Sequence, residues 1–591
     1  MLKEKIETKV IAAIKKAIEN GELGELKESP ETVAVDLPKN PDHGDRVISI
    51  AMKLTKEAKV PPRNIAQAIS DNIDQEGITA IDIAGPGFIN LKFDWETLEE
   101  IVTEINNLGS GYAQLNETNK PEPELKSILL EYVSANPTGD LHLGHGRQAV
   151  LGSALANLLK KAGYKVHNEF YINDAGAQIE KLGKSCKAAV LINEGLMAEA
   201  DYDDENCYPL DSMNEFITKD YYQAKLNSTD YQAIPETDYA TLARLKFLDA
   251  QKEILEKARV VFEKWYSEKE NLHINGKVAA ACNKLLEKDM AYEEDGALWF
   301  KAKEFGDERD RVLKKQDGKF TYLAADLAYH QDKLERGFDR LINLWGADHH
   351  GQIAGMKGIL EAAGEDSSKL EVVLMQMVSL AKNGQEVKMS KRSGDIVTIS
   401  DLIDEVGLDA FRYFLVESQA SNRVVFDLEL AKKQDKDNPV YYIQYAHARC
   451  SSIIRNITEE RMNSSTQELE APILSKEELE AWQKDFKTNS KLFATKFEDL
   501  NEQELKSTKQ LILFLAQYPD IIFDAALNRA PNKLAHYLKE LASLFHQFYT
   551  HNRVISEDKE LIKARLSLVS ATKTILKDGL DILAISAPER M

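Results

Sequence analysis

The chain has 591 residues, a formal net charge of −22 at pH 7, 43% hydrophobic residues and 29% charged residues. This length predicts three or four domains, and the composition is that of an ordinary globular protein. No apolar run approaches the roughly 18 residues that span a bilayer, and residues 1–5 lack the apolar core of a signal peptide, so we expect a cytoplasmic protein with no membrane partner.

The cysteines and the net charge argue against a metal or disulfide framework and against non-specific nucleic-acid binding. Cys186, Cys207, Cys282 and Cys450 are scattered, with no Cys-x-x-Cys pair, so neither a structural metal nor a disulfide framework is predicted. The acidic balance disfavours indiscriminate binding of nucleic acid, because phosphate is repelled. Any RNA would have to be recognised by shape and particular contacts.

Residues 1–112 predict a small α+β module. Helices are expected at 3–18, 47–56 and near 64–73, and residues 81–93 read as two strands around a glycine turn. Phe88 could stack on an unpaired base and Asn90 could bond its edge. The alternative, in which Phe88 is core and Asn90 caps a turn, fits the residues equally well.

A strand-turn-helix-strand unit follows the polar linker at 121–124. Residues 128–130 form an apolar strand, residues 136–139 a turn, and residues 166–172 a second strand after a helix capped by Gly163. The helix start offers free backbone N–H groups to polyphosphate, and His142 and His145 can add ring N–H donors. Gly144, without a Cβ, lets a base approach the backbone.

Three later stretches complete the pattern. Tyr322 and Asp326 lie four apart in a helical pattern, so ring and carboxylate share a face. Residues 341–345 read as a strand leading into a turn at 346–348. An apolar strand-like run at 372–380 precedes a basic loop bounded by glycines at 384–394, and Ser400 is the expected N-cap of the next helix. From residue 428 onward helices dominate.

The stretch at 131–147, which contains His142 and His145, and the basic loop at 384–394 together resemble the paired signatures of the class I aminoacyl-tRNA synthetases. Further motifs resemble the bacterial arginyl-tRNA synthetases: Glu-Tyr-Val-Ser-Ala-Asn-Pro-Thr-Gly at 131–139, Tyr-Ile-Asn-Asp-Ala-Gly at 171–176, Trp-Gly-Ala-Asp-His-His-Gly at 345–351 and Asn-Pro-Val-Tyr-Tyr at 438–442. Both ends also match, at 39–45 and 587–591. The resemblance therefore covers essentially the whole chain.

This resemblance implies an α/β multidomain fold. It assigns residues 1–112 to an N-terminal α+β domain that meets the tRNA elbow, 120–455 to a Rossmann-like class I catalytic domain with an insertion at about 181–291, and 456–591 to an all-α helical anticodon-binding domain. It implies ATP-dependent ligation of L-arginine to tRNA(Arg) through an arginyl-adenylate. Mg²⁺ is expected to arrive with ATP. A monomer is expected, and arginine activation is expected to require bound tRNA.

The resemblance also assigns residues to roles. The catalytic residues are His142, His145, Lys388 and Lys391. The expected ATP site comprises His142, Gly144, His145, Gly346, Asp348, His349, Met389, Ser390 and Lys391. The expected arginine site comprises Glu131, Ser134, Asn136, Tyr322, Asp326 and Gln352, with Ser134 and Asn136 pointing the same way from a strand end to hold the α-amino group. Phe88 and Asn90 are expected to contact tRNA.

Three other functions compete with this interpretation. Another class I synthetase, such as the cysteine enzyme, is disfavoured by the lack of a zinc-ligand cluster and by Tyr322 with Asp326. A non-catalytic RNA-binding relative should have lost its phosphate-handling residues, yet both signatures are intact. A small nucleotidyltransferase of the same fold would not need the terminal modules.

Overall fold

The computed structural model describes residues 2–38, 40, 43–115, 120–382, 384–387, 397–462, 469–475, 477–481, 491–497 and 499–591. The N-terminal module packs α1 (Leu2–Glu19), α2 (Ile50–Ala58) and α3 (Pro62–Asn72) against a sheet of order β1-β2-β4-β3, formed by Val35–Asp36, Arg46–Ile48, Phe88–Phe93 and Ile78–Ala84. The hairpin and two helices are confirmed. The helix expected at 47–56 was wrong at its start, because residues 46–48 pair with β4.

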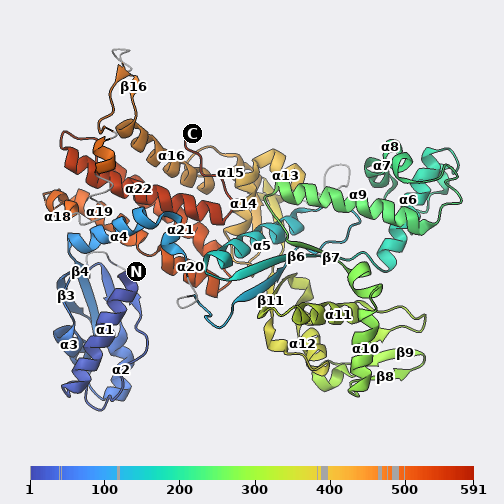
Figure 1. Ribbon diagram of the computed structural model, residues 1–591, viewed down its shortest axis with the longest axis horizontal. Coiled ribbons are helices and arrows are strands. Elements are labelled where there is room, and N and C mark those ends of the chain that lie inside the picture. The colour runs from blue at the N-terminus through green and yellow to red at the C-terminus, as the bar shows by residue number, and fades with distance from the viewer. Residues whose placement is uncertain are drawn as a thin grey trace.

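A five-stranded parallel sheet forms the centre of the molecule (Figure 1). Its order is β12-β11-β5-β6-β7, formed by Leu370–Met375, Arg340–Gly346, Ser127–Glu131, Lys165–Ile172 and Lys264–Ser267. Residues 128–130 in β5 are fully buried, as a strand covered on both faces requires. Helices α5 (Leu143–Lys161), α11 (Tyr322–Glu335) and α12 (Ile353–Ala362) follow β5, β10 and β11 in the chain.

The chain leaves the sheet twice between β6 and β11. The first excursion holds α6 (Ala177–Asn193), α7 (Leu210–Phe216), α8 (Lys219–Lys225) and α9 (Glu236–Lys257), and α9 leads back from the end of this arm to the sheet (Figure 1). The second holds α10 (Lys277–Glu287) and the small sheet β8 (Ala291–Glu294), β9 (Ala297–Phe300) and β10 (Arg311–Lys314). Strand β7 lies between them and pairs with β6, so the stretch at 181–291 is not one uninterrupted insertion.

The run at 372–380 is not one strand. It divides between β12 and β13 (Val378–Lys382), which belong to different sheets, and β13 pairs with β14 (Gln385–Val387) and β15 (Val424–Asp427). Helix α13 (Ile399–Val406) is capped by Thr398, whose side chain forms a reciprocal capping box with Asp401. The expected cap Ser400 was therefore wrong by two residues.

The C-terminal part is helical. After α14 (Leu408–Val416), α15 (Leu428–Lys432) and α16 (Pro439–Thr458), a short ribbon of β16 (Arg461–Met462) and β17 (Leu469–Glu470) precedes the bundle of α18 (Leu492–Phe497), α19 (Glu502–Leu515), α20 (Tyr518–Leu527), α21 (Asn532–His551) and α22 (Lys559–Ile582). Residues 502–527 are long and apolar enough to cross a membrane by composition, and 56% of their most apolar 18-residue window is buried. They break into two helices, and most of their apolar residues belong to the core, although Phe523 and Leu527 are exposed.

Candidate active site

The sheet has a topological switch point between β5 and β11. These strands are parallel neighbours, yet the chain runs from β5 toward β6 on one side and from β11 toward β12 on the other. The loops at their carboxyl ends therefore diverge and leave a crevice, where ligands bind in open α/β sheets. The turn before α5 follows β5, and the 3-10 helix Ala347–Gln352 follows β11.

Two histidines cap the start of α5. The Nδ1 atom of His142 accepts from the Gly144 N–H at 3.0 Å, the Nδ1 atom of His145 accepts from the His142 N–H at 3.3 Å, and the rings stack with centroids 3.8 Å apart. Because both Nδ1 atoms accept, both protons reside on Nε2. Burial lowers the pKa of His142, and burial with His142 beside it lowers the pKa of His145 to about 3. At neutral pH both rings are uncharged N–H donors.

The structure shows why residue 144 is a glycine, for a reason that the sequence did not suggest. A Cβ at this position would lie 2.9 Å from Cε1 and 3.1 Å from Nδ1 of His142, so glycine leaves room for the capping ring. Gly346 plays a similar part after β11, where a Cβ would lie 2.4 Å from an oxygen of Asp348. Both glycines let a polar side chain fold back over the turn at a strand end.

The predicted adenosine residues lie in one turn. The Asp348 side chain is 81% exposed and lies 3.5 Å from Nε2 of His349, and Nδ1 of His349 lies 3.1 Å from Oε1 of Gln352. The turn directly follows Gly346, the last residue of β11. An exposed carboxylate at this crevice can accept hydrogen bonds from ribose hydroxyls.

The predicted site residues of the basic loop, Lys388, Met389, Ser390 and Lys391, lie outside the described residues. The segments on either side of them both contact the start of α5. Ile399 N–H donates to Leu141 O at 2.9 Å, and Thr398 forms a β-bridge with His142. The histidine turn is thus joined directly to the segment that follows the basic residues.

The preceding segment is held by Arg147. This guanidinium is fully buried and donates to the carbonyls of Gln376 at 2.5 Å, Met377 at 3.5 Å and Gln419 at 2.9 Å. Gln376 and Met377 form the connection between β12 and β13, the strand that leads toward the basic residues. Helix α5 therefore contacts both flanks of the second signature.

A cavity of about 260 Å³ opens beside the crevice and is lined by Tyr322, Asp326, Trp345 and Gln352 among others. Tyr322 begins α11 and Asp326 lies one turn later, so the expected shared face is confirmed. Burial, with the Glu131 and Glu268 carboxylates nearby, raises the pKa of Asp326 to about 7, against a smaller opposing effect of Lys333. The surroundings of Asp326 thus disfavour its ionised form, which a bound cation would stabilise.

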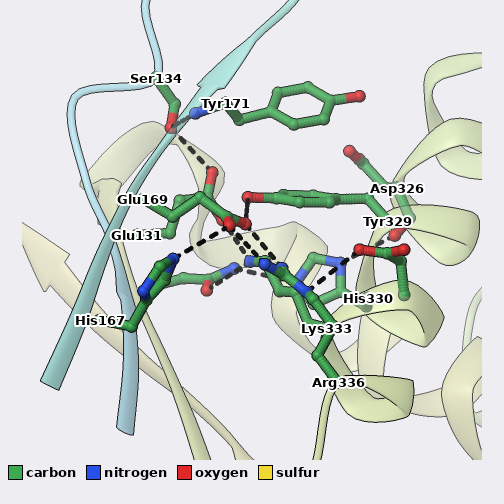
Figure 2. A network of polar contacts seen from close by, with 12 residues as sticks. Glu131, Ser134, His167, Glu169, Tyr171, Asp326, Tyr329, His330, Lys333 and Arg336 are labelled. Atoms are coloured by element: carbon green, nitrogen blue, oxygen red, sulfur yellow. Dashed lines mark hydrogen bonds and ion pairs between the residues drawn. The ribbon is translucent and has the colours of Figure 1, made fainter. Parts of the chain in front are cut away.

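A buried polar network lies beneath this cavity (Figure 2). The fully buried Lys333 ammonium pairs with Glu131 Oε2 at 2.5 Å and donates to Asn343 Oδ1 at 3.1 Å. Asn343 and Glu131 are direct partners in the parallel register of β11 and β5. The charge of Glu131, which we expected to act as a second acid for arginine, is already balanced by Lys333.

The same network fixes α11 to the sheet. The Nδ1–H of His330 donates to the Asp326 carbonyl at 2.8 Å, and its Nε2 accepts from the Asn343 amide at 2.9 Å. Burial and the Lys333 charge lower the pKa of His330 to about 3, so the ring is neutral. His330 therefore ties the turn that carries Asp326 to β11.

Ser134 and Asn136 do not have the expected strand geometry. Strand β5 ends at Glu131, and Val133 and Ser134 adopt left-handed backbone angles, with φ of 69° and 45°. Ser134 Oγ donates to Glu131 Oε1 at 2.9 Å, whereas the Asn136 amide donates to Gln178 at 2.6 Å. The expectation that both residues belong to a strand end was wrong, because the strand ends at Glu131.

Glu268 was missed from the sequence. It follows β7 at the carboxyl edge of the sheet, is 4% exposed, and contacts His273 Nε2 at 2.8 Å. Burial, together with the Glu268 and Asp326 carboxylates, raises the pKa of Tyr171 well above its usual value, which places these groups together. The sequence signal for Glu268 was the short aromatic strand at 264–267 that directly precedes it. We had assigned this stretch to the expected insertion.

Phe88 and Asn90 lie on β4 of the N-terminal sheet rather than at the switch point. Phe88 is partly buried and Asn90 is 4% exposed. Asn90 faces Val47 and Asp82 in the strand register, and its carbon Cβ lies 3.4 Å from the position a Cβ on Gly44 would take.

Comparisons with known proteins match the chain in three parts. Residues 4–93 match the model described as Arginyl tRNA synthetase N terminal domain, 109–447 the tRNA synthetases class I (R) catalytic domain, and 443–591 the DALR anticodon binding domain. The switch-point site and the catalytic-domain match define a class I aminoacyl-tRNA synthetase.

More particularly, the chain belongs to the arginyl-tRNA synthetase family. It is similar to the arginine–tRNA ligase of Bacillus licheniformis, with 41% identity over 98% of each chain. Among solved structures it resembles a putative arginyl-tRNA synthetase from Campylobacter jejuni, with 32% identity, a TM-score of 0.69, and coverage of 84% of this chain and all of that one. The Thermus thermophilus arginyl-tRNA synthetase, 20% identical over the whole of both chains with a TM-score of 0.69, shares the fold.

Proposed function

We propose that this protein ligates L-arginine to tRNA(Arg) in an ATP-dependent reaction that passes through arginyl-adenylate. The observation that carries the proposal is the attachment of the His142 turn to both flanks of the second signature, beside an acid-lined cavity. Phosphate-binding groups and a site for a cation thus share one crevice. Family membership supports the same activity.

In the first step, an oxygen of the arginine carboxylate attacks the α-phosphorus of ATP and diphosphate leaves. The residues align the reacting atoms and stabilise the developing charge. His142 and His145 donate Nε2–H groups, the first N–H groups of α5 add their dipoles, and Lys388 and Lys391 supply the cations. In the second step, a terminal ribose hydroxyl of tRNA attacks the mixed anhydride and AMP leaves.

The arginine side chain binds in the cavity of α11. Its guanidinium offers five donors in a planar fork, and carboxylates accept such forks two bonds at a time. Asp326 and Glu268 are the acceptors, with Tyr322 and Gln352 at the cavity wall. Ser134 and Asn136 face the α-amino end, and Glu131 acts through its bond to Ser134.

ATP binds with its adenosine over Gly346, Asp348 and His349 and its phosphates at Gly144 and the segment containing Met389 and Ser390. Among the described residues, no three His, Cys, Asp or Glu side chains gather as metal ligands. The donors at the start of α5 are N–H groups, which suit phosphate oxygens rather than cations. Mg²⁺ arrives bound to the phosphates of ATP, as an ion that keeps several waters.

The three parts of the chain divide the work on tRNA. Residues 1–112, including Phe88 and Asn90, meet the elbow, residues 120–455 catalyse both steps, and residues 456–591 bind the anticodon. The protein acts as a monomer in the cytoplasm. The division of the tRNA contacts follows the three matched domains, and the N-terminal sheet lies apart from the central sheet (Figure 1).

The test is aminoacylation of total tRNA with each amino acid in turn. We expect arginine alone to be attached, with lysine rejected because its compact ammonium cannot imitate a fork. Acceptance of another amino acid in preference to arginine would refute the assignment of the cavity. Attachment of arginine that persists without ATP would refute the adenylate route.

A further inference from the structure

Asp174 belongs to the motif at 171–176, for which the proposed reaction supplies no role. It lies in the turn after β6, next to β7 in the parallel sheet, and is 1% exposed. A buried carboxylate must be fully hydrogen-bonded or paired to remain stable. Its partners therefore indicate what it holds in place.

Two of these partners flank Glu268. The Lys269 N–H donates to Oδ1 of Asp174 at 2.9 Å, and the Ser267 hydroxyl donates to Oδ2 at 2.8 Å. The Asp174 carboxylate thus holds the residue before and the residue after Glu268, which lines a cavity together with His273 and Tyr322. The direction of Glu268 is set by this grip, because its backbone is fixed on both sides.

The turn that follows Glu268 also depends on Ser267. Ser267 Oγ also accepts from the Glu270 N–H at 3.1 Å, and the π-helical turn Lys269–His273 that begins here ends at His273, whose ring contacts Glu268 at 2.8 Å. If the base of this turn shifts, the imidazole that steadies the Glu268 carboxylate shifts with it.

The third partner comes from the inserted arm. Arg244, on α9, pairs with Oδ2 of Asp174 at 2.8 Å, and its side chain is 14% exposed. Helix α9 continues to the far end of the arm formed by α6 to α8 (Figure 1). A cavity of about 310 Å³ lies at this junction, lined by Asp174, Glu236, Thr237, Arg244 and Lys269 among others. The ion pair therefore joins the arm to the turn across a loosely packed boundary.

We propose that Asp174 is a positioning residue that aims Glu268 at bound arginine, and that its ion pair with Arg244 makes arginine affinity depend on how the inserted arm is seated. The proposal rests on the proposed role of Glu268 in arginine binding. All three partners of Asp174 are donors, so an asparagine, which must present an NH₂ group, leaves at least one of them facing another donor.

The experiment compares steady-state aminoacylation, at saturating tRNA, of the wild type, Asp174→Asn and Arg244→Gln. Asp174→Asn should raise the KM for arginine about tenfold, since one charge-assisted bond is lost, and leave the KM for ATP unchanged. Arg244→Gln should raise the KM for arginine about threefold, and the double variant should resemble Asp174→Asn because both act through one contact.

Asp339→Asn is the matched control. Asp339 also accepts from two backbone N–H groups and a serine hydroxyl, those of Lys126 and Ser127, but at the amino edge of the same sheet. It should lower the thermal midpoint to a similar degree without changing the KM for arginine. A general loss of stability is thereby separated from a loss of positioning.

Glu268→Gln separates the two proposals. If it leaves the KM for arginine unchanged, the proposed role of Glu268 is wrong. If it raises that KM while Asp174→Asn does not, the cavity assignment stands and the positioning role is overturned. Should Asp174→Asn fail to fold, Arg244→Gln decides, because an unchanged KM for arginine in that variant overturns the coupling to the arm.

Discussion

The affinity for arginine should depend on the protonation of Asp326. Burial and two neighbouring carboxylates raise its pKa to about 7 from an ordinary 3.8. A guanidinium against this carboxylate favours the ionised form and draws the pKa back toward the ordinary value. As the pH falls through about 7, Asp326 in the free enzyme takes up a proton, and this proton must leave before arginine binds. The affinity for arginine therefore decreases as the pH decreases.

The magnitude follows from the difference between the two pKa values. Arginine binding should weaken about tenfold between about pH 8 and about pH 6, and by about another tenfold by about pH 5. The full difference of about three pKa units corresponds to about 4 kcal/mol. Asp326→Asn should accordingly cost about 2 to 4 kcal/mol of arginine binding near neutral pH.

Calorimetric titration with arginine across this range measures the effect, below the pH at which the arginine α-amino group titrates. The His145 and His330 rings do not titrate in this range, because their pKa values are lowered to about 3. Glu417→Gln is the control, since burial also raises the pKa of Glu417 to about 7, at the end of α14. A flat profile for the wild type, or an unchanged slope in Asp326→Asn, would refute the reasoning.

Three further outcomes are expected. Pyrophosphate exchange with ATP and arginine should be negligible without tRNA, and brisk exchange in its absence would reject the tRNA requirement. His145→Ala should lower kcat roughly 10²-fold with little change in the KM for arginine, because it removes a donor to the transition state; a change confined to the arginine KM would contradict this. Lys333→Met should destabilise the fold by about 3 to 5 kcal/mol by leaving Glu131 unpaired, and adding Glu131→Gln should restore much of the thermal midpoint; no restoration would argue against the pair.

Local patterns predicted the elements that frame the site. Strands β5 and β11 follow from short, mostly apolar runs, because each must be buried on both faces, and α11 follows from helical spacing around Tyr322 and Asp326. The turn proposed to bind phosphate follows from its position between a strand and a helix. In each case the decisive interactions join residues that are near in sequence.

The misses come from contacts between distant residues. The run at 372–380 breaks in two where Arg147, 229 residues before Gln376, binds the carbonyls of the connection. The pairing of Glu131 with Lys333 was not predicted, because Lys333 lies 202 residues further on. The sequence pattern of either stretch cannot predict the strand break or the ion pair, since each depends on a partner that is distant in the chain.

The charges of the crevice are divided between its two sides. On the arginine side, the buried cation Lys333 is already paired with Glu131, and Arg336 with Glu169 at 2.6 and 2.8 Å, so the Asp326 and Glu268 carboxylates remain available to the proposed arginine substrate. On the phosphate side, the capping histidines are neutral hydrogen-bond donors and add no negative charge that would repel phosphate. Polyphosphate and a cationic amino acid can therefore lie in one crevice because its charges are separated along the switch point between β5 and β11.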